Sequence, residues 1–397
     1  MDVRVETVAA AQAPARAAPR IASIDLMRGV VMIIMAIDHV RDYFSPFPYE
    51  PTDLSKASPA LFLTRWITHF CAPTFVFLAG TSAFLYARGA GSRGRVQRFL
   101  LTRGLWLVLL ELTWISFCWR FDLNGVNFQV IWALGWSMVV LAALLYLPRA
   151  AMAAVGLALV FGHNAFDGWH YRDFPGAAGW AWALLHEPRF ETLASGYQIA
   201  ALYPLVPWAG VMALGYVFGD VLLLPAAQRD RWMRGLGGAA VLLFILLRLS
   251  NYYGDAQQWT ANARGTLYTL LDALNTTKYP PSLQYLLMTL GPVLLLLPWL
   301  ERWRGALADR VTVFGRVPFF FYLLHLPLIH LASDIAVRIA FRTTVPAFSK
   351  QLPAGYEPSL ARVYLVWLLL ILLLYPLCRW YAGYKARHKE YWWLSYL

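Results

Sequence analysis

Ten long apolar stretches dominate this sequence, and they limit the folds that are open to it. A helix needs roughly 20 residues to cross a hydrocarbon core of about 30 Å, and most of the stretches come close to that length. Of the 397 residues, 59% are hydrophobic and 14% are charged, whereas a soluble domain is about half apolar and about a quarter charged. The sequence therefore predicts an all-α protein, a polytopic membrane helix bundle of about ten transmembrane helices. The expected spans are 24–44, 61–87, 99–118, 128–147, 151–166, 200–221, 235–251, 282–300, 313–333 and 360–382.

The basic residues indicate how these helices are oriented. Cytoplasmic loops of membrane proteins contain an excess of Lys and Arg. More than half of the 34 Lys and Arg fall in alternate connections, on the side that also holds the N-terminus. This distribution predicts a multipass protein of the inner (plasma) membrane with both termini in the cytoplasm. It also accounts for the net charge of +12 without a nucleic-acid partner.

Composition divides the chain into three parts. Residues 1–22 are rich in Ala and Pro and have no apolar core, which predicts a disordered cytoplasmic leader and not a cleavable signal peptide. Residues 23–384 form the transmembrane domain, and residues 385–397 form a basic and aromatic cytoplasmic tail. The outer loops are unusually long and predict a substrate vestibule on the outer side. These loops are 45–60, 167–199, 252–281 and 334–359.

The first span, IDLMRGVVMIIMAIDHVRDYF, contains ionisable side chains that a bilayer penalises by roughly 2.5–3.5 kcal/mol each at its centre. A helix turns about 100° and rises about 1.5 Å per residue, so Arg28 and His39 lie on one face about 16 Å apart. The stripe on that face consists of Asp25, Arg28, Met32, Met35, His39 and Asp42. Such a stripe either faces a bundle interior or a water-filled cavity, or it combines an interfacial ion pair with a structural histidine.

Two other spans also place a histidine beside a polar neighbour. In the second span, Arg65 and His69 are four residues apart on one face, and Pro73 is expected to kink the helix by freeing a backbone carbonyl. In the ninth span, Tyr322 precedes His325 by three residues on one face. Three membrane histidines on separate helices predict a single polar centre. Their spacing matches no defined set of metal ligands, so we expect no metal.

The segments RIASIDLMRG and MAIDH resemble the first catalytic helix of the transmembrane acyltransferase superfamily. That grouping includes the heparan-α-glucosaminide N-acetyltransferase family and the O-antigen-acetylase type of membrane acyltransferase. The O-antigen-acetylase type begins with Leu-Asp-x-x-Arg-Gly and has a His 11 residues after the Arg. In this chain, the residues that match are Asp25, Arg28, Gly29 and His39.

Two later segments are similar to the heparan-acetylase branch. FCAPTFVFLAG resembles its second helix, and FGRVPFFFYLLH resembles its late helix through Gly315, Tyr322 and His325. In that branch the catalytic His lies in the outer loop after the first helix, but the loop SPFPYEPTDLSKASPA of this chain contains no His. The resemblance therefore assigns the role to His39, as in the O-antigen-acetylase type, or to His69.

The resemblance implies an integral membrane acyltransferase of the acetyl-CoA-dependent N- or O-acetyltransferase class. It would move an acyl group, with acetyl expected, from cytoplasmic acyl-CoA to an amine or hydroxyl of an extracytoplasmic glycan or similar acceptor. A histidine suits this chemistry as a base or as an acyl carrier because its pKa lies near neutrality. The candidate catalytic residues are His39, His69, Asp42 and His325, and we expect Asp42 to orient the His39 ring.

Basic residues at the two membrane faces are candidates for binding. Acyl-CoA phosphates need cations, and the candidates at the inner helix ends are Arg28, Arg88, Arg98 and Arg316. For the acceptor and the developing oxyanion, the candidates on the outer side are Arg41, Arg65, Lys278 and Tyr322. The alternative for the inner arginines is ordinary positive-inside charge. For Lys278 it is an ammonium that reaches the lipid headgroups.

Two other classes of function compete with acyl transfer. A transporter or flippase could use the polar stripe as a proton or substrate path, but such proteins often contain inverted repeats, and the sequence shows none. A structural or assembly protein would not need histidines on three helices. The sequence leaves the acceptor, the acyl chain length and the oligomeric state open, and a homodimer is compatible with it.

Overall fold

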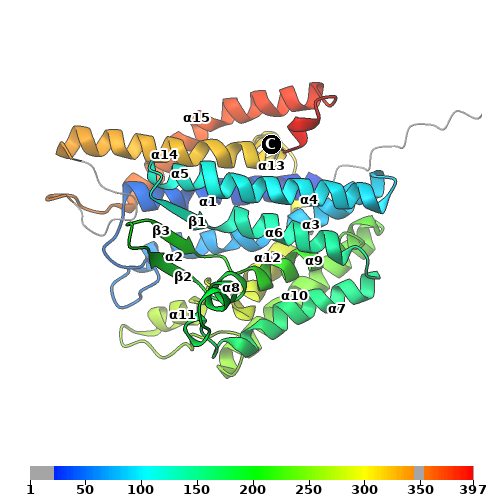
Figure 1. Ribbon diagram of the computed structural model, residues 1–397, viewed down its shortest axis with the longest axis horizontal. Coiled ribbons are helices and arrows are strands. Elements are labelled where there is room, and N and C mark those ends of the chain that lie inside the picture. Colours follow the sequence, from blue (N-terminus) through cyan, green and yellow to red (C-terminus); the bar gives the residue numbers. More distant parts are fainter. Residues whose placement is uncertain (1–21, 344–352, 397) are drawn as a thin grey trace, which may run out of the picture.

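The computed structural model describes residues 22–343 and 353–396, in which long helices lie alongside one another (Figure 1). Residues 1–21 of the expected leader lie outside this part of the chain. The helices are α1 (Ala22–Phe44), α2 (Pro59–Ile67), α3 (Cys71–Gly89), α4 (Arg93–Leu110), α5 (Ser116–Arg120), α6 (Val130–Leu144), α7 (Arg149–Gly162), α8 (Ala177–Leu185), α9 (Leu205–Phe218), α10 (Ala226–Ser250), α11 (Thr266–Leu274), α12 (Leu283–Arg302), α13 (Ala306–Arg316), α14 (Pro318–Phe341) and α15 (Leu360–Arg387).

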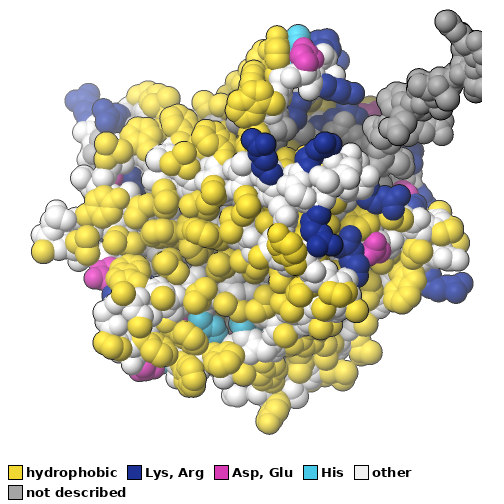
Figure 2. Space-filling view, turned by 45° about the vertical axis from the view of Figure 1, so that its right-hand side comes forward, with side chains coloured by type: hydrophobic (Ala, Val, Ile, Leu, Met, Phe, Trp, Pro, Cys, Tyr) yellow, Lys and Arg dark blue, Asp and Glu magenta, His cyan; other side chains and the backbone are white. Residues whose placement is uncertain are grey.

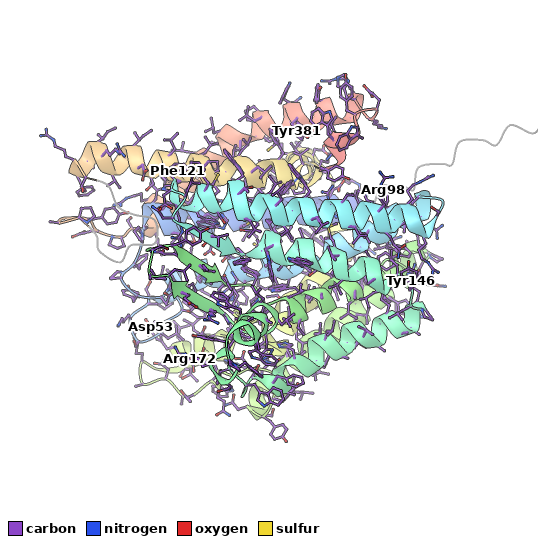
Figure 3. The ribbon with its side chains drawn as sticks, in the orientation of Figure 1. Asp53, Arg98, Phe121, Tyr146, Arg172 and Tyr381 are labelled. Carbon is purple, nitrogen blue, oxygen red and sulfur yellow. The ribbon has the colours of Figure 1, made fainter. Side chains whose placement is uncertain are left out.

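Eight helical stretches of the described residues are long and apolar enough to cross a membrane. They occupy eight of the ten expected spans, and α1 and the shorter α6 occupy the other two. The prediction of an all-α, polytopic membrane bundle is therefore confirmed. Figure 2 shows a broad apolar face, with Lys and Arg side chains gathered near the end of the bundle that is turned toward the viewer. Arg98 and Tyr146 lie at one end of the bundle and Asp53 lies at the other (Figure 3).

Helix α1, which carries charged residues at both ends, lies inside the bundle. It contacts α3, α12, α13, α14 and α15, and most of its side chains are buried. Neighbouring helices therefore separate its ionisable groups from lipid, which removes the penalty that a lipid-facing position would impose.

The N-terminal half of α1, which is the inner half in the predicted orientation, packs against α13 at the level of the backbone. A Cβ atom added at Gly29 would lie 2.1 Å from the Val311 carbonyl oxygen, and one added at Gly315 would lie 1.7 Å from the Asp25 carbonyl oxygen. Only glycine permits such an approach, because any side chain would overlap a backbone atom that cannot move away. The close packing of α1 against α13 therefore explains why Gly29 and Gly315 of the sequence motifs are glycines.

The ninth span differs from the expectation of one continuous helix over 313–333. The chain turns at Val317, so Arg316 ends α13 and Tyr322 belongs to α14. The cause is Pro318, which lacks an N–H group and disfavours helical backbone angles at the residue before it. Arg316 and His325 are thus on different helices.

The expected kink near Pro73 is present as a short 3₁₀ segment, Thr68–Phe70, between α2 and α3. Pro73 cannot donate to the carbonyl of His69, which is four residues earlier. The Tyr285 hydroxyl on α12 donates to that carbonyl instead, at 2.8 Å. A tertiary contact thus satisfies the acceptor that the proline leaves open.

Three short strands, which the sequence analysis did not predict, lie near the end of the bundle that contains Asp53 (Figures 1 and 3). They are β1 (Gly125–Phe128), β2 (Arg189–Thr192) and β3 (Gln198–Ala201), in the order β1-β3-β2. Strand β1 runs parallel to β3, from the pair Gly125 and Gln198 to the pair Phe128 and Ala201, and β2 runs antiparallel to β3.

Helix α6 follows β1 almost directly, and a buried carboxylate caps its first turn. Glu111 Oε2 accepts hydrogen bonds from the backbone N–H groups of Ile131 at 3.0 Å and Trp132 at 3.2 Å. Glu111 begins a π-helical turn, Glu111–Ile115, which follows α4. The carboxylate thereby satisfies donors that a helix start leaves unpaired, and it fixes the start of α6 within the bundle.

Candidate active site

The structure brings together two of the three expected membrane histidines. His39 Nδ1 on α1 lies 2.7 Å from His325 Nε2 on α14, and the two rings stack with their centroids 4.9 Å apart. His69 is buried at the junction of α2 and α3 and forms no hydrogen bond with either of them among the described residues. The polar centre is therefore a histidine pair, and His69 lies outside it.

The hydrogen bonds of His325 assign the tautomers of both rings. His325 Nδ1 lies 2.7 Å from the Tyr322 carbonyl oxygen, which can only accept, so this nitrogen must donate. In a neutral ring Nε2 then accepts, and His39 Nδ1 donates to it. His39 Nε2 keeps a lone pair, has no hydrogen-bond partner among the described residues and is not one of their fully buried polar atoms. A base or an acyl carrier needs such a nitrogen, with a lone pair that no other group of the protein occupies.

A dense set of ion pairs surrounds the outer end of α1. The Asp38 carboxylate forms an ion pair with the Arg41 guanidinium at 2.5 Å and another with Arg65 of α2. Asp42 pairs with Arg41 at 2.6 Å. The expected contact of Asp42 with His39 is absent, because the Asp42 carboxylate turns to the adjacent guanidinium and His325 occupies the hydrogen-bonding nitrogen of His39.

Lys278 lies beside this network, in the connection before α12. Its ammonium nitrogen is 5.2 Å from the centre of the Tyr279 ring, and it acts electrostatically on Asp38 and His39. Among the described residues it forms no ion pair. Of the three outer cations that the sequence indicates, Arg41 and Arg65 are thus bound to carboxylates, whereas Lys278 is not.

A cavity of about 310 Å³ lies on the inner side of the histidine pair. Arg28 lies at its inner part, where the guanidinium is 3.6 Å from the Asp25 carboxylate, donates to the Leu78 carbonyl at 3.0 Å and contacts the Ser82 hydroxyl. Three further cations from different helices line the same space: Arg103, Arg316 and Lys385. Four positive side chains therefore converge at one cavity.

The cavity extends along the stripe of α1 toward the histidines. Met32 and Met35 line it, and Tyr322 lines it from α14. The Tyr322 ring is 6.5 Å from the His39 ring, and its hydroxyl has no hydrogen-bond partner among the described residues. Of the two alternatives for the stripe, the structure supports the one in which it faces a cavity. Asp25 and Arg28 also form the ion pair that the other alternative contained.

The remaining inner candidates lie elsewhere. Arg88 lines a second cavity, and Arg98 is exposed on α4 at the end of the bundle and lines neither of these two spaces (Figure 3). Sequence analysis did not assign Arg103 and Lys385 to the site. The position of Arg103, five residues after Arg98 and directly before the apolar run GLWLVLL of α4, was a usable signal, because a cation among apolar membrane residues needs a polar surrounding. Lys385 lies in the last turn of α15 and not in a separate tail.

A family comparison agrees with this geometry. The sequence pattern described as heparan-alpha-glucosaminide N-acetyltransferase, catalytic, matches residues 20–249, which is more than half of the chain. The chain belongs to this family. Membership supports a transmembrane acetyltransferase in general, in a family of enzymes that use acetyl-CoA, over a transporter or flippase. Among curated proteins, none matches the chain.

The matched range includes only one half of the histidine pair. It runs from α1 to α10 and contains Arg28 and His39, whereas Tyr322 and His325 on α14 lie beyond it. The contact between the His39 and His325 rings therefore joins α14 to the part of the chain that matches the family. That contact spans 286 residues of sequence.

Proposed function

We propose that this family member transfers an acetyl group from cytoplasmic acetyl-CoA to an amine or hydroxyl of an extracytoplasmic glycan or similar acceptor. The protein would lie in the plasma membrane with both termini in the cytoplasm. The observation that supports this proposal is the cavity, which begins among four inner cations and ends at Tyr322 and Met35, about one helical turn from His39. Such a space leads from an anion-binding end toward a basic nitrogen inside the bundle.

The inner cations suit the phosphates of the donor. Charge-assisted hydrogen bonds from guanidinium and ammonium groups to phosphate are among the stronger polar contacts in proteins. Arg28 is held by the Leu78 carbonyl and the Ser82 hydroxyl, so its guanidinium is oriented before any ligand arrives. The methionines farther along the cavity offer an apolar wall for the uncharged arm of the donor.

The histidine pair suits the proton transfer that acetyl transfer requires. The acceptor nitrogen or oxygen forms a bond with the acetyl carbon, the carbon–sulfur bond breaks, and the acceptor's proton ends on the departing thiolate. His39 Nε2 can hold that proton in passing, or it can carry the acetyl group between two half-reactions. His325 orients the ring through its own bond to the Tyr322 carbonyl. The Tyr322 hydroxyl is placed to donate to the developing oxyanion, and Lys278 adds positive charge on the outer side.

Replacing His39 tests this assignment. We expect His39→Ala to lower acetyl transfer by at least about a hundredfold, since a positioned base contributes roughly that factor or more. Binding of acetyl-CoA should change little, because the ring lies beyond the end of the cavity. The measurement is transfer of labelled acetyl groups by the purified protein, with donor affinity measured separately. Normal turnover of His39→Ala, together with loss of turnover in His69→Ala, would move the catalytic role to the second span.

A further inference from the structure

A second cavity, of about 640 Å³, lies where the α3–α4 and α6–α7 connections meet. Three arginines line it, Arg88, Arg93 and Arg149, and no carboxylate does. It shares no lining residue with the cavity beside Arg28, which we propose binds the acetyl donor and call the donor cavity. Its charge is therefore of one sign and separate from the cations around Arg28.

The arginines of this cavity are poorly neutralised within the protein. The carboxylate of Asp220 is 3.5 Å from Arg149, but both side chains are about half exposed. Arg88 and Arg93 form no ion pair among the described residues. Like charges gathered around one space repel one another, so an anion inside it would lower the energy of all three. Ordinary positive-inside charge requires cations at this membrane face, but it does not require them to line one cavity.

Local structure adds to the positive potential and holds the side chains in place. Helices α4 and α7 both begin at this cavity, and a helix start has a partial positive charge. The start of α7 has no side-chain cap. The Arg149 guanidinium lies 4.6 Å from the centre of the Tyr216 ring, and that of Arg93 lies 5.6 Å from the centre of the Tyr146 ring. These contacts favour one orientation of each guanidinium.

We infer that this cavity binds a phosphate-bearing anion, independently of the acetyl donor. The cavity lies at the start of α4, and Arg98 of α4 is at one end of the bundle (Figure 3), which is the expected level of lipid headgroups. Basic pockets between membrane helices are suited to such groups. An anionic phospholipid and a soluble phosphate share this chemistry. The inference does not depend on the acetyltransferase reaction, so it can fail or succeed separately from it.

The test compares two double variants of the full-length protein in nanodiscs. Arg88→Gln/Arg93→Gln removes two lining charges, and Arg95→Gln/Arg231→Gln removes two exposed charges that line neither cavity. Native mass spectrometry measures retention of phosphatidylglycerol against phosphatidylcholine, with and without inorganic phosphate. We expect the first variant to lose about thirtyfold in phosphatidylglycerol affinity, since each arginine near a membrane surface is worth about 1 kcal/mol. We expect the second to lose much less.

The outcomes separate the sources of the anion and can overturn the inference. If phosphatidylglycerol is retained in preference to phosphatidylcholine, the bound anion is a lipid headgroup. If neither lipid is retained selectively and the protein binds inorganic phosphate, the anion is a soluble phosphate. Arg88→Lys/Arg93→Lys should restore part of the affinity, which guards against a glutamine variant that merely misfolds. Equal losses in the two double variants would overturn the inference. A loss of acetyl-CoA affinity in Arg88→Gln/Arg93→Gln would also overturn it, because the cavity would then be part of the donor site.

Discussion

The two ends of α1 have similar residues in different surroundings. At the outer end, Asp38 and Asp42 hold Arg41 and Arg65 in short ion pairs. At the inner end, Asp25 and Arg28 are 3.6 Å apart and border a cavity. An aspartate–arginine pair in a membrane helix therefore has two uses, and the difference is whether accessible space lies beside it.

This difference separates a structural role from a binding role. A closed network of charges keeps neighbouring helices in register, and its loss leaves an unpaired buried charge. A pair beside a cavity can exchange one partner for a ligand, because Arg28 is also held by the Leu78 carbonyl and the Ser82 hydroxyl. The two ends should thus respond differently to the same substitution.

The largest effect should follow from Asp38→Asn. This change leaves Arg41 and Arg65 without their shared carboxylate, and breaking a buried pair costs about 3–5 kcal/mol. We expect a lower melting temperature and a smaller folded fraction in detergent, measured by thermal unfolding. Asp25→Asn is the matched change at an equally buried aspartate and should cost less, because Arg28 keeps its contacts with the Leu78 carbonyl and the Ser82 hydroxyl. Equal losses of stability at the two ends would remove the distinction between them.

A smaller effect, on donor binding and not on folding, should follow from Arg28→Ala. If Arg28 holds a phosphate, acetyl-CoA affinity should fall by roughly 1.5–3 kcal/mol, about tenfold to a hundredfold. Arg28→Lys should restore part of it, because it keeps the charge without the two-pronged geometry. Titration of acetyl-CoA at two salt concentrations measures the affinities of both variants. Unchanged affinity with a loss of thermal stability would make Arg28 a structural residue like Arg65.

Gly315→Ala should cost about 1–3 kcal/mol of stability, in the range of an overpacked core. The new methyl group would meet the Asp25 carbonyl and push α13 away from the inner end of α1. Because Arg316 lines the donor cavity from α13, acetyl-CoA affinity should fall as well. Thermal unfolding with and without acetyl-CoA measures the two losses. Gly94→Ala, at an exposed glycine of α4 with open space around it, is the control and should lower neither quantity, since alanine favours the helix.

The smallest effect should follow from Arg98→Gln. Arg98 is exposed and lines neither cavity, so donor affinity and stability should change by less than about 1 kcal/mol. The measurement is again acetyl-CoA titration beside thermal unfolding. A loss as large as that of Arg28→Ala would extend the donor site along the outside of α4.

The sequence by itself determined the all-α, polytopic character of the chain, the approximate limits of most spans and the residues that share a face of α1. Bilayer thickness and helix geometry fix these properties within single segments, which is why Arg28 and His39 could be placed on one stripe. The break at Val317 was also within reach, since Pro318 supplies its cause.

Only the tertiary structure decided which side chains meet across helices. Helical periodicity says which residues of one helix point the same way, but not which other helix lies opposite. His39 therefore meets His325 and not Asp42, although Asp42 is three residues away and His325 is 286 residues away. Arg103 and Lys385 reach the cavity beside Arg28 for the same reason, because the packing of α4 against α3 and α6, and of α15 against α1, α13 and α14, brings them to it.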